Sequence, residues 1–429
     1  MSAVILQVGQ CGNQVGLEWC EMLSKTSEQC GHGSPYITKE GTLAVVCVDS
    51  DPKVLRRAQR LVRNKTLLES NIVQGKGGRG NNWAYGYHGH WVEEGDQLLQ
   101  QAMEAVRQEA ERRDYYGGTI MLHSVSGGTG SGLGSRLCEE IRAEFPVSHI
   151  LTVSVVPHQS GESPLQHYNT LLSLAALHRS SDAILLFHND QALSYSRDLQ
   201  KKVSGTFGLS SGLAQGTLSF MNKHIVSCIA GLLLPVHNLT TASNWSLGVE
   251  PWELIRSVCP MPAAKLLSIT QAGSREKLKW DSLASSTLQS VPQVSLAGRS
   301  YTSRAVLAVA RGDQDNSFIM SSALNKLKRG HRCVAWNPFP VDHWTVCVIL
   351  CLFSDPCNEV CLSPNAHLLT VCSNHSSVTS LLDHVVHRTK EMICVRAYLH
   401  WYERYGVEDQ DFQQAVETLL KVVEEYDAH

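Results

Sequence analysis

A run of glycines between a strand pattern and a helix pattern, Gly127–Gly132, limits the possible folds more than any other feature of the sequence. The apolar run before it, Thr119–Val125, has the length and composition of a buried strand. Glycines at such a turn let backbone N–H groups approach an anion, and the N-terminus of the following helix favours negative charge. No Lys-Ser or Lys-Thr pair follows, and the spacing is not that of the dinucleotide-binding fingerprint. We therefore predict a phosphate-binding loop of another type, the alternative being a purely structural turn.

Short apolar runs alternate with helical patterns through the first 190 residues, which predicts an α/β fold with a doubly wound parallel sheet. The expected strands are Val4–Val8, Leu43–Val48, Thr119–Val125, His149–Val156 and Ala183–Phe187. A glycine-bearing turn is expected at Gly9–Gly16, followed by a helical pattern that ends at about Leu23. The other expected helices are Leu133–Phe145 and Leu165–His178.

The pattern changes after about residue 200, where a second α/β domain is expected. It has a helical segment, Asn222–Leu234, and strand-like runs at Leu266–Thr270, Ala305–Ala310, Cys333–Asn337 and Thr345–Phe353. Beyond it, Ser376–Tyr426 is helical with a break near Gly406, and its two amphipathic stretches are expected to pack as an antiparallel pair.

Charge and hydropathy exclude several classes of protein. Lys plus Arg number 37 and Asp plus Glu number 40, and this net charge of −3 argues against nucleic acid or an anionic membrane as the main partner. The N-terminus has no positively charged leader, and the apolar runs are shorter than the roughly 20 residues of a spanning helix. We therefore expect a soluble, intracellular protein whose cysteines are mostly reduced.

Polar residues follow several of the expected strands. In open α/β sheets a ligand sits outside the carboxyl ends of the strands, so these residues should surround one site together with the glycine loop. Carboxylates in this set could hold a hydrated Mg²⁺. The strand-end groups are Gly9-Gln10-Cys11, Asp49-Ser50-Asp51, Gly80-Asn81-Asn82 and His188-Asn189-Asp190.

These motifs resemble those of the tubulins, and the resemblance extends over the whole chain. It implies a tubulin-like fold with a GTP-binding domain over 1–200, an intermediate domain over 201–375 and a C-terminal helical hairpin over 376–429. Within the family, Gly80–Tyr87 and His178–Leu186 look most like the delta and zeta branch. The motifs are GQCGNQVG (Gly9–Gly16), VDSDP (Val48–Pro52), GNNWAYGY (Gly80–Tyr87), SGGTGSG (Ser126–Gly132), YNTLLSL (Tyr168–Leu174) and RAYLHWYERYG (Arg396–Gly406).

The resemblance also implies a site for GTP or GDP with Mg²⁺. Gln166 stands where the family has a ribose-contacting Glu, and Leu218 stands where it has an aromatic residue on guanine, so both bear on nucleotide affinity. Carried over by position, the phosphates would meet Ser126, Gly127, Gly128, Thr129, Gly130, Ser131, Gly80 and Asn81; Gln10 and Cys11 would lie beside phosphate and base; Asp51 would lie near Mg²⁺; Glu162 and Gln166 near the ribose; and Asn189 and Asn222 at the guanine edge.

Hydrolysis in tubulin-like polymers is assisted by a loop of the next subunit, which the resemblance aligns with Gly248–Pro260. Glu253 and Glu250 fall at the acidic positions of that loop, where a carboxylate can orient the attacking water. The alternative is that both are first-turn acids favoured by the helix dipole. Pro251 and Gly248 depart from the family pattern, so GTPase activity with an acid supplied in trans is left open.

Two further segments are open to interpretation. The stretch 53–79 carries one acid, Glu69, against the cations Lys53, Arg56, Arg57, Arg60, Arg63, Lys65, Lys76 and Arg79, and could contact an acidic neighbour or be a solvated helix face. The run His400-Trp401-Tyr402 is expected to pack against the intermediate domain.

The resulting expectation is a divergent GTP-binding tubulin of the cytoplasmic cytoskeleton. It would act as a structural or assembly component of centrioles or basal bodies of cilia, contacting other tubulins head to tail and centriolar or basal-body proteins. One alternative is a polymerising microtubule GTPase, and another is an adaptor whose nucleotide is static. The choice between the delta and zeta types stays open.

Overall fold

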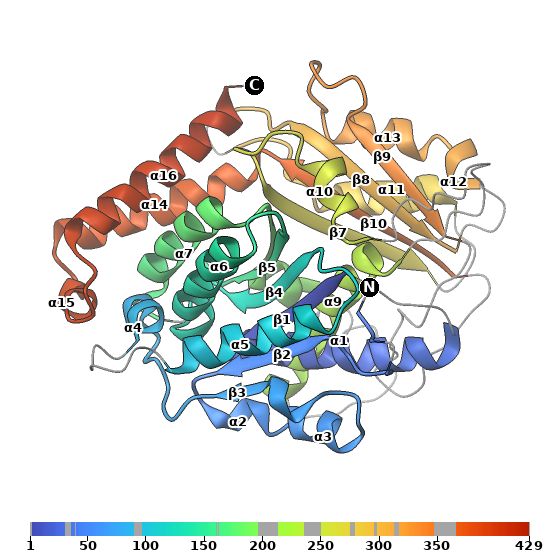
Figure 1. Cartoon of the computed structure of the whole chain (residues 1–429). Coiled ribbons are helices and arrows are strands. Elements are labelled where there is room, and N and C mark those ends of the chain that lie inside the picture. The colour runs from blue at the N-terminus through green and yellow to red at the C-terminus, as the bar shows by residue number, and fades with distance from the viewer. Residues whose placement is uncertain are drawn as a thin grey trace.

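A ten-stranded sheet with helices on both faces runs through the molecule (Figure 1). The computed structural model describes residues 2–30, 36–38, 40–89, 97–159, 161, 163–195, 213–235, 250–274, 279–295, 298–312, 317–346 and 366–428. The strand order is β3-β2-β1-β4-β5-β6-β7-β10-β8-β9. The strands are β1 (Ala3–Val8), β2 (Val45–Asp49), β3 (Ile72–Gln74), β4 (Gly118–Ser124), β5 (His149–Val156), β6 (Ala183–His188), β7 (Leu266–Ser274), β8 (Ser303–Arg311), β9 (Val341–Val346) and β10 (His367–His375).

Strand β10 is antiparallel to both of its neighbours, β7 and β8, while every other pairing of the named strands is parallel. The other described strands therefore start at one edge of the sheet and end at the opposite edge. We call these the amino edge and the carboxyl edge.

Two apolar cores lie on the two faces of the sheet. Along β1, Ile5 faces a core shared with α1 (Gly9–Cys30) and α9 (Leu213–Leu233), whereas Val4 and Leu6 face a core shared with α5 (Gln97–Glu111), α6 (Gly134–Glu144) and α7 (Gln166–Ser180). Apolar residues at successive positions are typical of a parallel strand that is covered on both faces. The helices at the β8 end of the sheet are α10 (Glu253–Val258), α11 (Trp280–Gln289), α12 (Ser317–Met320) and α13 (Ala323–Gly330).

The C-terminal helices α14 (Val378–Cys394) and α16 (Asp409–Asp427) lie side by side outside α7, as Figure 1 shows. A short helix, α15 (Leu399–Glu403), joins them, and here the sequence-based expectation is wrong. Tyr402 does not pack on the intermediate region but lies against Tyr168 at the start of α7, with ring centroids 5.3 Å apart.

The α/β fold, with its doubly wound parallel sheet and paired C-terminal helices, is confirmed. Three local predictions are wrong. The expected glycine-bearing turn Gly9–Gly16 is the first part of α1, which begins at Gly9. Cys333–Asn337 is not a strand, since Cys333 makes a single bridge to Ser303 after a turn in which Arg332 has a positive φ of 46°. The strand of that region is β9, which begins before Thr345; residues 347–353 of the prediction lie outside the described residues.

The two α/β regions share the one sheet, because β6 pairs with β7 across Ile184 and Leu266. The predicted boundary at 200/201 lies outside the described residues, so the three-part division stays a prediction.

Candidate functional site

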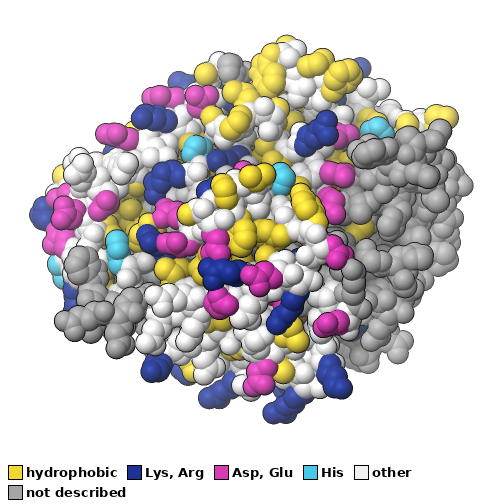
Figure 2. All heavy atoms as spheres, viewed as in Figure 1, with side chains coloured by type: hydrophobic (Ala, Val, Ile, Leu, Met, Phe, Trp, Pro, Cys, Tyr) yellow, Lys and Arg dark blue, Asp and Glu magenta, His cyan; other side chains and the backbone are white. Residues whose placement is uncertain are grey.

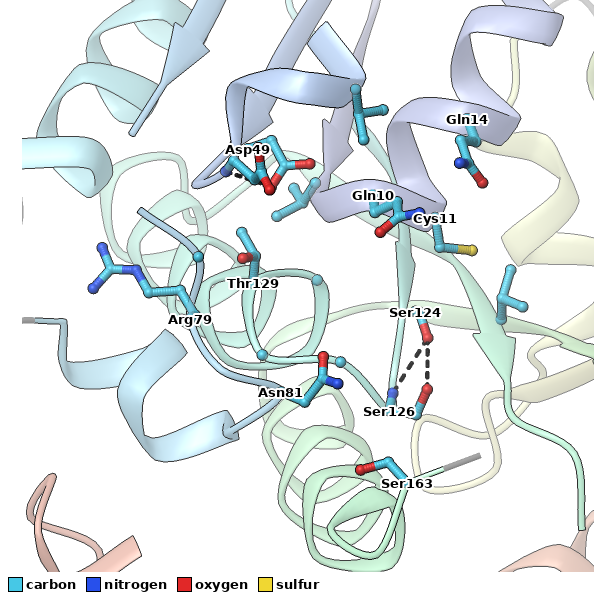
Figure 3. Close-up of a pocket in the computed structure, with 18 of the residues that line it drawn as sticks. Gln10, Cys11, Gln14, Asp49, Arg79, Asn81, Ser124, Ser126, Thr129 and Ser163 are labelled. Carbon is cyan, nitrogen blue, oxygen red and sulfur yellow. Dashed lines mark hydrogen bonds between the residues drawn. The ribbon is translucent and has the colours of Figure 1, made fainter. Parts of the chain in front are cut away.

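A cavity of about 790 Å³ opens at the carboxyl edge of the sheet (Figure 3). It lies over the ends of β1, β2, β4, β5 and β6 and is closed on one side by α9. Its lining is mostly polar and comprises Gln10, Cys11, Gln14, Asp49, Ser50, Asp51, Lys53, Gly78, Arg79, Gly80, Asn81, Ser124, Ser126, Gly127, Gly128, Thr129, Gly130, His158, Ser163, Gln166, Asn189 and Asn222, with the apolar Val8, Val54, Val155, Leu218, Met221 and Ile225.

The glycine loop forms the floor of this cavity, and its glycines have different roles. Gly9 has φ +73°, and a Cβ there would lie 2.7 Å from the backbone N of Gly130. A Cβ at Gly128 would lie 2.6 Å from the carbonyl of Arg79. By contrast, a Cβ at Gly127 would meet nothing within 4 Å. Gly9 and Gly128 are therefore needed for close backbone packing, whereas Gly127 borders open space at which an anion can approach the backbone.

The loop continues into η2 (Thr129–Leu133), a wide helical turn that leads directly into α6. Ser131 is fully buried there, and its hydroxyl donates to the carbonyl of Gly127. The hydroxyl of Ser131 thus supports the loop from within, and the contact of this residue with phosphate stays a prediction. Thr129, in contrast, lines the cavity and shares a 2.5 Å hydrogen bond with the hydroxyl of Ser50.

A buried histidine holds the loop from beneath. His123 on β4 lies 2.9 Å through Nδ1 from the carbonyl of Gly130 and 2.8 Å through Nε2 from the hydroxyl of Ser154. Burial lowers the pKa of His123 to about 4, so the ring is neutral at physiological pH. A neutral imidazole can donate from one nitrogen and accept at the other, which satisfies both contacts.

Asn169 on α7 ties two cavity loops together. Its Nδ2 donates to the carbonyl of Asn81 at 2.7 Å and to that of Ser126 at 2.8 Å. Its Oδ1 accepts from the backbone N–H of Trp83 at 2.9 Å, at the start of α4 (Trp83–His88). Asn169 is fully buried, so the loops carrying the predicted phosphate contacts are held by a side chain outside the cavity.

Two carboxylates reach the cavity from the end of β2. Asp49 is buried, which raises its pKa to about 6; its Oδ1 accepts from the N–H of Asp51, and its Oδ2 has no partner among the described residues. Asp51 is the N-cap of α2 (Pro52–Leu55), where its side chain accepts from the N–H of Lys53 at 3.0 Å. No group of three or more His, Cys, Asp or Glu that could hold a metal occurs in the described ranges. Two oxygen donors fit Mg²⁺ if a ligand and water supply the rest.

The other end of the cavity is less polar. Asn189 follows β6, and Asn222 lies on α9 beside Met221 and the half-exposed Leu218. Gln166 is buried, and its Nε2 donates to the carbonyl of His158 at 3.2 Å. The predicted ribose contact Glu162 lies outside the described residues.

The structure adds lining residues that sequence reasoning did not single out. Gln14 lies one helical turn after Gln10 on α1, and that i, i+4 spacing was a usable signal. Ser124 is the last residue of β4 and shares a 3.0 Å hydrogen bond with Ser126 (Figure 3). Arg79 points away from the loop in Figure 3 and lies over the Tyr85 ring, 5.0 Å from its centroid.

Glu250 and Glu253 lie at the amino edge, opposite the cavity. The hydroxyl of Ser2, which precedes β1, donates to Glu250. Trp252 between them stacks on His149, the first residue of β5, at 5.4 Å. Along β5 the two edges are roughly 23 Å apart at 3.3 Å per residue. These acids are therefore far from their own chain's cavity.

Comparison with known proteins shows which domain contains this cavity. Residues 2–197 match the model of the tubulin/FtsZ family GTPase domain. Residues 2–197 form a GTPase domain of the tubulin/FtsZ family. It is 27% identical to a tubulin delta chain of Macaca fascicularis and 26% identical to that of Homo sapiens, over 99% of both sequences in each case. A nucleomorph tubulin beta chain of Guillardia theta is 25% identical over 99% of this chain and 95% of that one.

This GTPase domain contains every described cavity residue except those on α9. A domain of that family binds GTP and GDP. The delta chains are similar from end to end, so the likeness also extends over β7 to α16. Every helix within the described ranges is too short or too polar to cross a lipid bilayer.

Proposed function

We propose that this protein is a tubulin that holds GTP or GDP in the carboxyl-edge cavity and works as a structural or assembly component of centrioles or basal bodies. The observation that carries the nucleotide site is the open backbone at Gly127, next to a helix N-terminus and within a cavity of the size that cofactor sites have. The centriolar role is supported by the resemblance to delta chains.

In this proposal the phosphates lie on Ser126 to Gly130 and beside Gln10, Gly80 and Asn81, with Cys11 near phosphate and base. Asn189 and Asn222 read the guanine edge, because an amide both donates and accepts. Gln166 lies near the ribose. Asp51 and Asp49 hold a hydrated Mg²⁺ that the phosphates complete. This role is favoured by the buried Oδ2 of Asp49, which has no hydrogen-bond partner among the described residues.

We further propose that contacts to other tubulins are made head to tail. Both edges of the sheet expose large apolar side chains that a neighbouring subunit could cover. Beside the cavity, Trp401 is 45% exposed, and its carbonyl accepts from Asn82 next to the phosphate loops. At the amino edge, Val147 is 92% and Phe339 86% exposed, directly before β5 and β9.

Stacking of one subunit's amino edge on the next subunit's cavity would bring Glu253 and Glu250 to a bound nucleotide. Glu253 would then orient the attacking water, and Glu250 would lie on the metal side. A heterologous contact of this kind joins different surfaces of the two partners. Hydrolysis would therefore depend on assembly, and an isolated subunit would be a poor GTPase.

The deciding experiment measures the nucleotide released on denaturing the purified protein, by ion-exchange chromatography. Near-stoichiometric GTP is expected, because the isolated chain lacks the neighbour's acids. Near-stoichiometric GDP would favour the second candidate, a polymerising microtubule GTPase. The position of Glu253 at the amino edge supports this candidate. Absence of guanine nucleotide, with no uptake of added GTP, would contradict both the centriolar GTP-binding protein and the microtubule GTPase. It would leave a nucleotide-static adaptor, a function that the exposed Leu218 favours.

A further inference from the structure

One face of the helical segment α2–α3 carries a row of cations that the nucleotide site does not use. The segment consists of α2 and α3 (Ala58–Arg63), and the residues that join them, Arg56 and Arg57, also have right-handed helical φ and ψ. Arg56, Arg60 and Arg63 follow at i, i+4 and i+7, which places them on one helical face. All three are exposed, whereas Leu55 and Ala58 are buried beneath them. We call this row of three arginines the basic ridge.

The ion pairs that the structure describes in this segment involve Lys53 and Arg57 and not the basic ridge. Arg57, on the other side of the segment, pairs with Glu18 at 3.0 Å and Glu21 at 2.8 Å and so holds the segment on α1. Arg56, Arg60 and Arg63 form no ion pair with any residue that the structure describes. Figure 2 shows Lys and Arg side chains along the lower rim of the molecule, where Figure 1 has α2 and α3. In a chain of net charge −3, such a row is a local excess.

The surroundings of the basic ridge select among anionic partners. A membrane-binding helix carries large apolar residues beside its cations, and single-stranded nucleic acid is held by aromatic platforms. The large hydrophobic side chains exposed in the described part of the chain include none between residues 53 and 79. The ridge therefore offers positive charge and hydrogen-bond donors, but no large apolar side chain and no aromatic ring. This combination is suited to binding carboxylates.

The spacing fits an extended chain. At 1.5 Å per residue, Arg56, Arg60 and Arg63 are about 6 and 4.5 Å apart along the helix axis. Alternate side chains of an extended peptide recur about every 6.6 Å. Three long guanidinium side chains can thus meet three successive carboxylates on one side of such a peptide, and each can bind bidentately.

We propose that the basic ridge docks an extended, glutamate-rich segment of a partner protein. This contact lies on α2–α3 at the β3 end of the sheet, so it is separate from the head-to-tail contacts and uses no residue that lines the cavity. Its strength comes from charge, so it weakens as ionic strength rises.

The test measures binding of a fluorescein-labelled peptide of ten glutamates to the full chain by fluorescence anisotropy at 50 mM salt. The triple variant Arg56→Gln/Arg60→Gln/Arg63→Gln is expected to bind at least about tenfold more weakly, since each lost pair is modest and three act together. The matched control removes the same charge from scattered exposed cations, Arg329→Gln/Lys390→Gln/Lys421→Gln, and is expected to change affinity less than about twofold.

Equal affinity of the triple variant and the control would overturn the proposal. So would equal or tighter binding, through the same three arginines, of a single-stranded 20-nucleotide RNA or of phosphatidylserine vesicles. Thermal melting of both variants checks the fold. If the triple variant melts early, the single variant Arg60→Gln, at an exposed position, is measured against Lys421→Gln with the same criteria, a loss of about twofold or more being expected.

Discussion

Tyr402, near the C-terminus, donates a 2.6 Å hydrogen bond to Oδ1 of Asn169, the side chain that holds both phosphate-side loops of the cavity. The C-terminal turn contacts the same region at two further points. Asn82 Nδ2 donates to the carbonyl of Trp401 at 2.9 Å, and Tyr405 stacks on Tyr85 at 4.5 Å. Residues more than 200 positions apart thus set the shape of one site.

Removing the hydroxyl at this point should weaken nucleotide binding without unfolding the protein. Tyr402→Phe keeps the ring and loses one buried hydrogen bond, about 1 kcal/mol, so the Kd for a fluorescent GTP analogue is expected to rise about fivefold. Asn169→Ala also leaves the Asn81 and Ser126 carbonyls unpaired and is expected to cost more than tenfold. The control Tyr405→Phe keeps its stacking and should bind normally; equal losses for the two Tyr variants would contradict the role of Tyr402.

Alanine at Gly9 should lower the stability of the protein, whereas alanine at Gly127 should lower its nucleotide affinity. Gly9→Ala forces a side chain into a positive φ and against Gly130, so a lower melting temperature is expected, with a loss of several kcal/mol. Gly127→Ala adds a methyl group to open space, so the melting temperature should hold while nucleotide affinity falls. Thermal melting and titration with the GTP analogue separate the two. Tight nucleotide binding by Gly127→Ala would place the phosphates elsewhere.

Acid should destabilise the protein through His123. Its pKa is about 4 in the folded protein and about 6.5 when exposed, so the unfolded chain binds the extra proton between these values. Stability is therefore present above pH 6.5 and is lost as pH falls, by about 2 kcal/mol at pH 5. Urea unfolding at pH 7.5 and pH 5 is expected to show a smaller pH difference in His123→Gln than in the unsubstituted protein. Identical pH differences would mean that His123 does not titrate on unfolding.

A mixing experiment tests hydrolysis in trans. Glu253→Ala keeps its cavity but lacks the acid at the amino edge, whereas Asn222→Ala has a weakened guanine contact but keeps Glu253. Each variant alone should hydrolyse GTP slowly. Their mixture is expected to regain roughly a quarter to a half of the unsubstituted rate per subunit, because one variant supplies the cavity and the other the acid. The release of phosphate is followed against protein concentration, and a mixture no faster than its parts would contradict the mechanism.

Much of the GTPase-domain half could be predicted because its signals are local. β5 was predicted from its first residue to its last, and the glycine loop was found from the Thr119–Val125 strand and the helix after it. The strand ends converge on one edge because parallel strands all finish there.

The remainder depends on contacts that sequence spacing does not reveal. β10 was missed because Thr370, Ser373 and Asn374 interrupt its apolar pattern, although all three are buried between neighbouring strands. Tyr402 was assigned to the wrong neighbour because nothing along the chain relates it to Asn169. Ser131 was expected at the ligand because it lies in the motif, yet its hydroxyl points back to the loop.

The bond from Tyr402 to Asn169 has a consequence for biosynthesis. While the protein is being translated, α7 and the glycine loop emerge from the ribosome more than 200 residues before α15, so the nascent GTPase domain must wait with Asn169 lacking its last partner. With nucleotide bound as proposed, its affinity would be lower until residue 402 has been added and has folded back. A messenger truncated before that codon would yield a chain with the whole glycine loop but without the contact that completes the partners of Asn169.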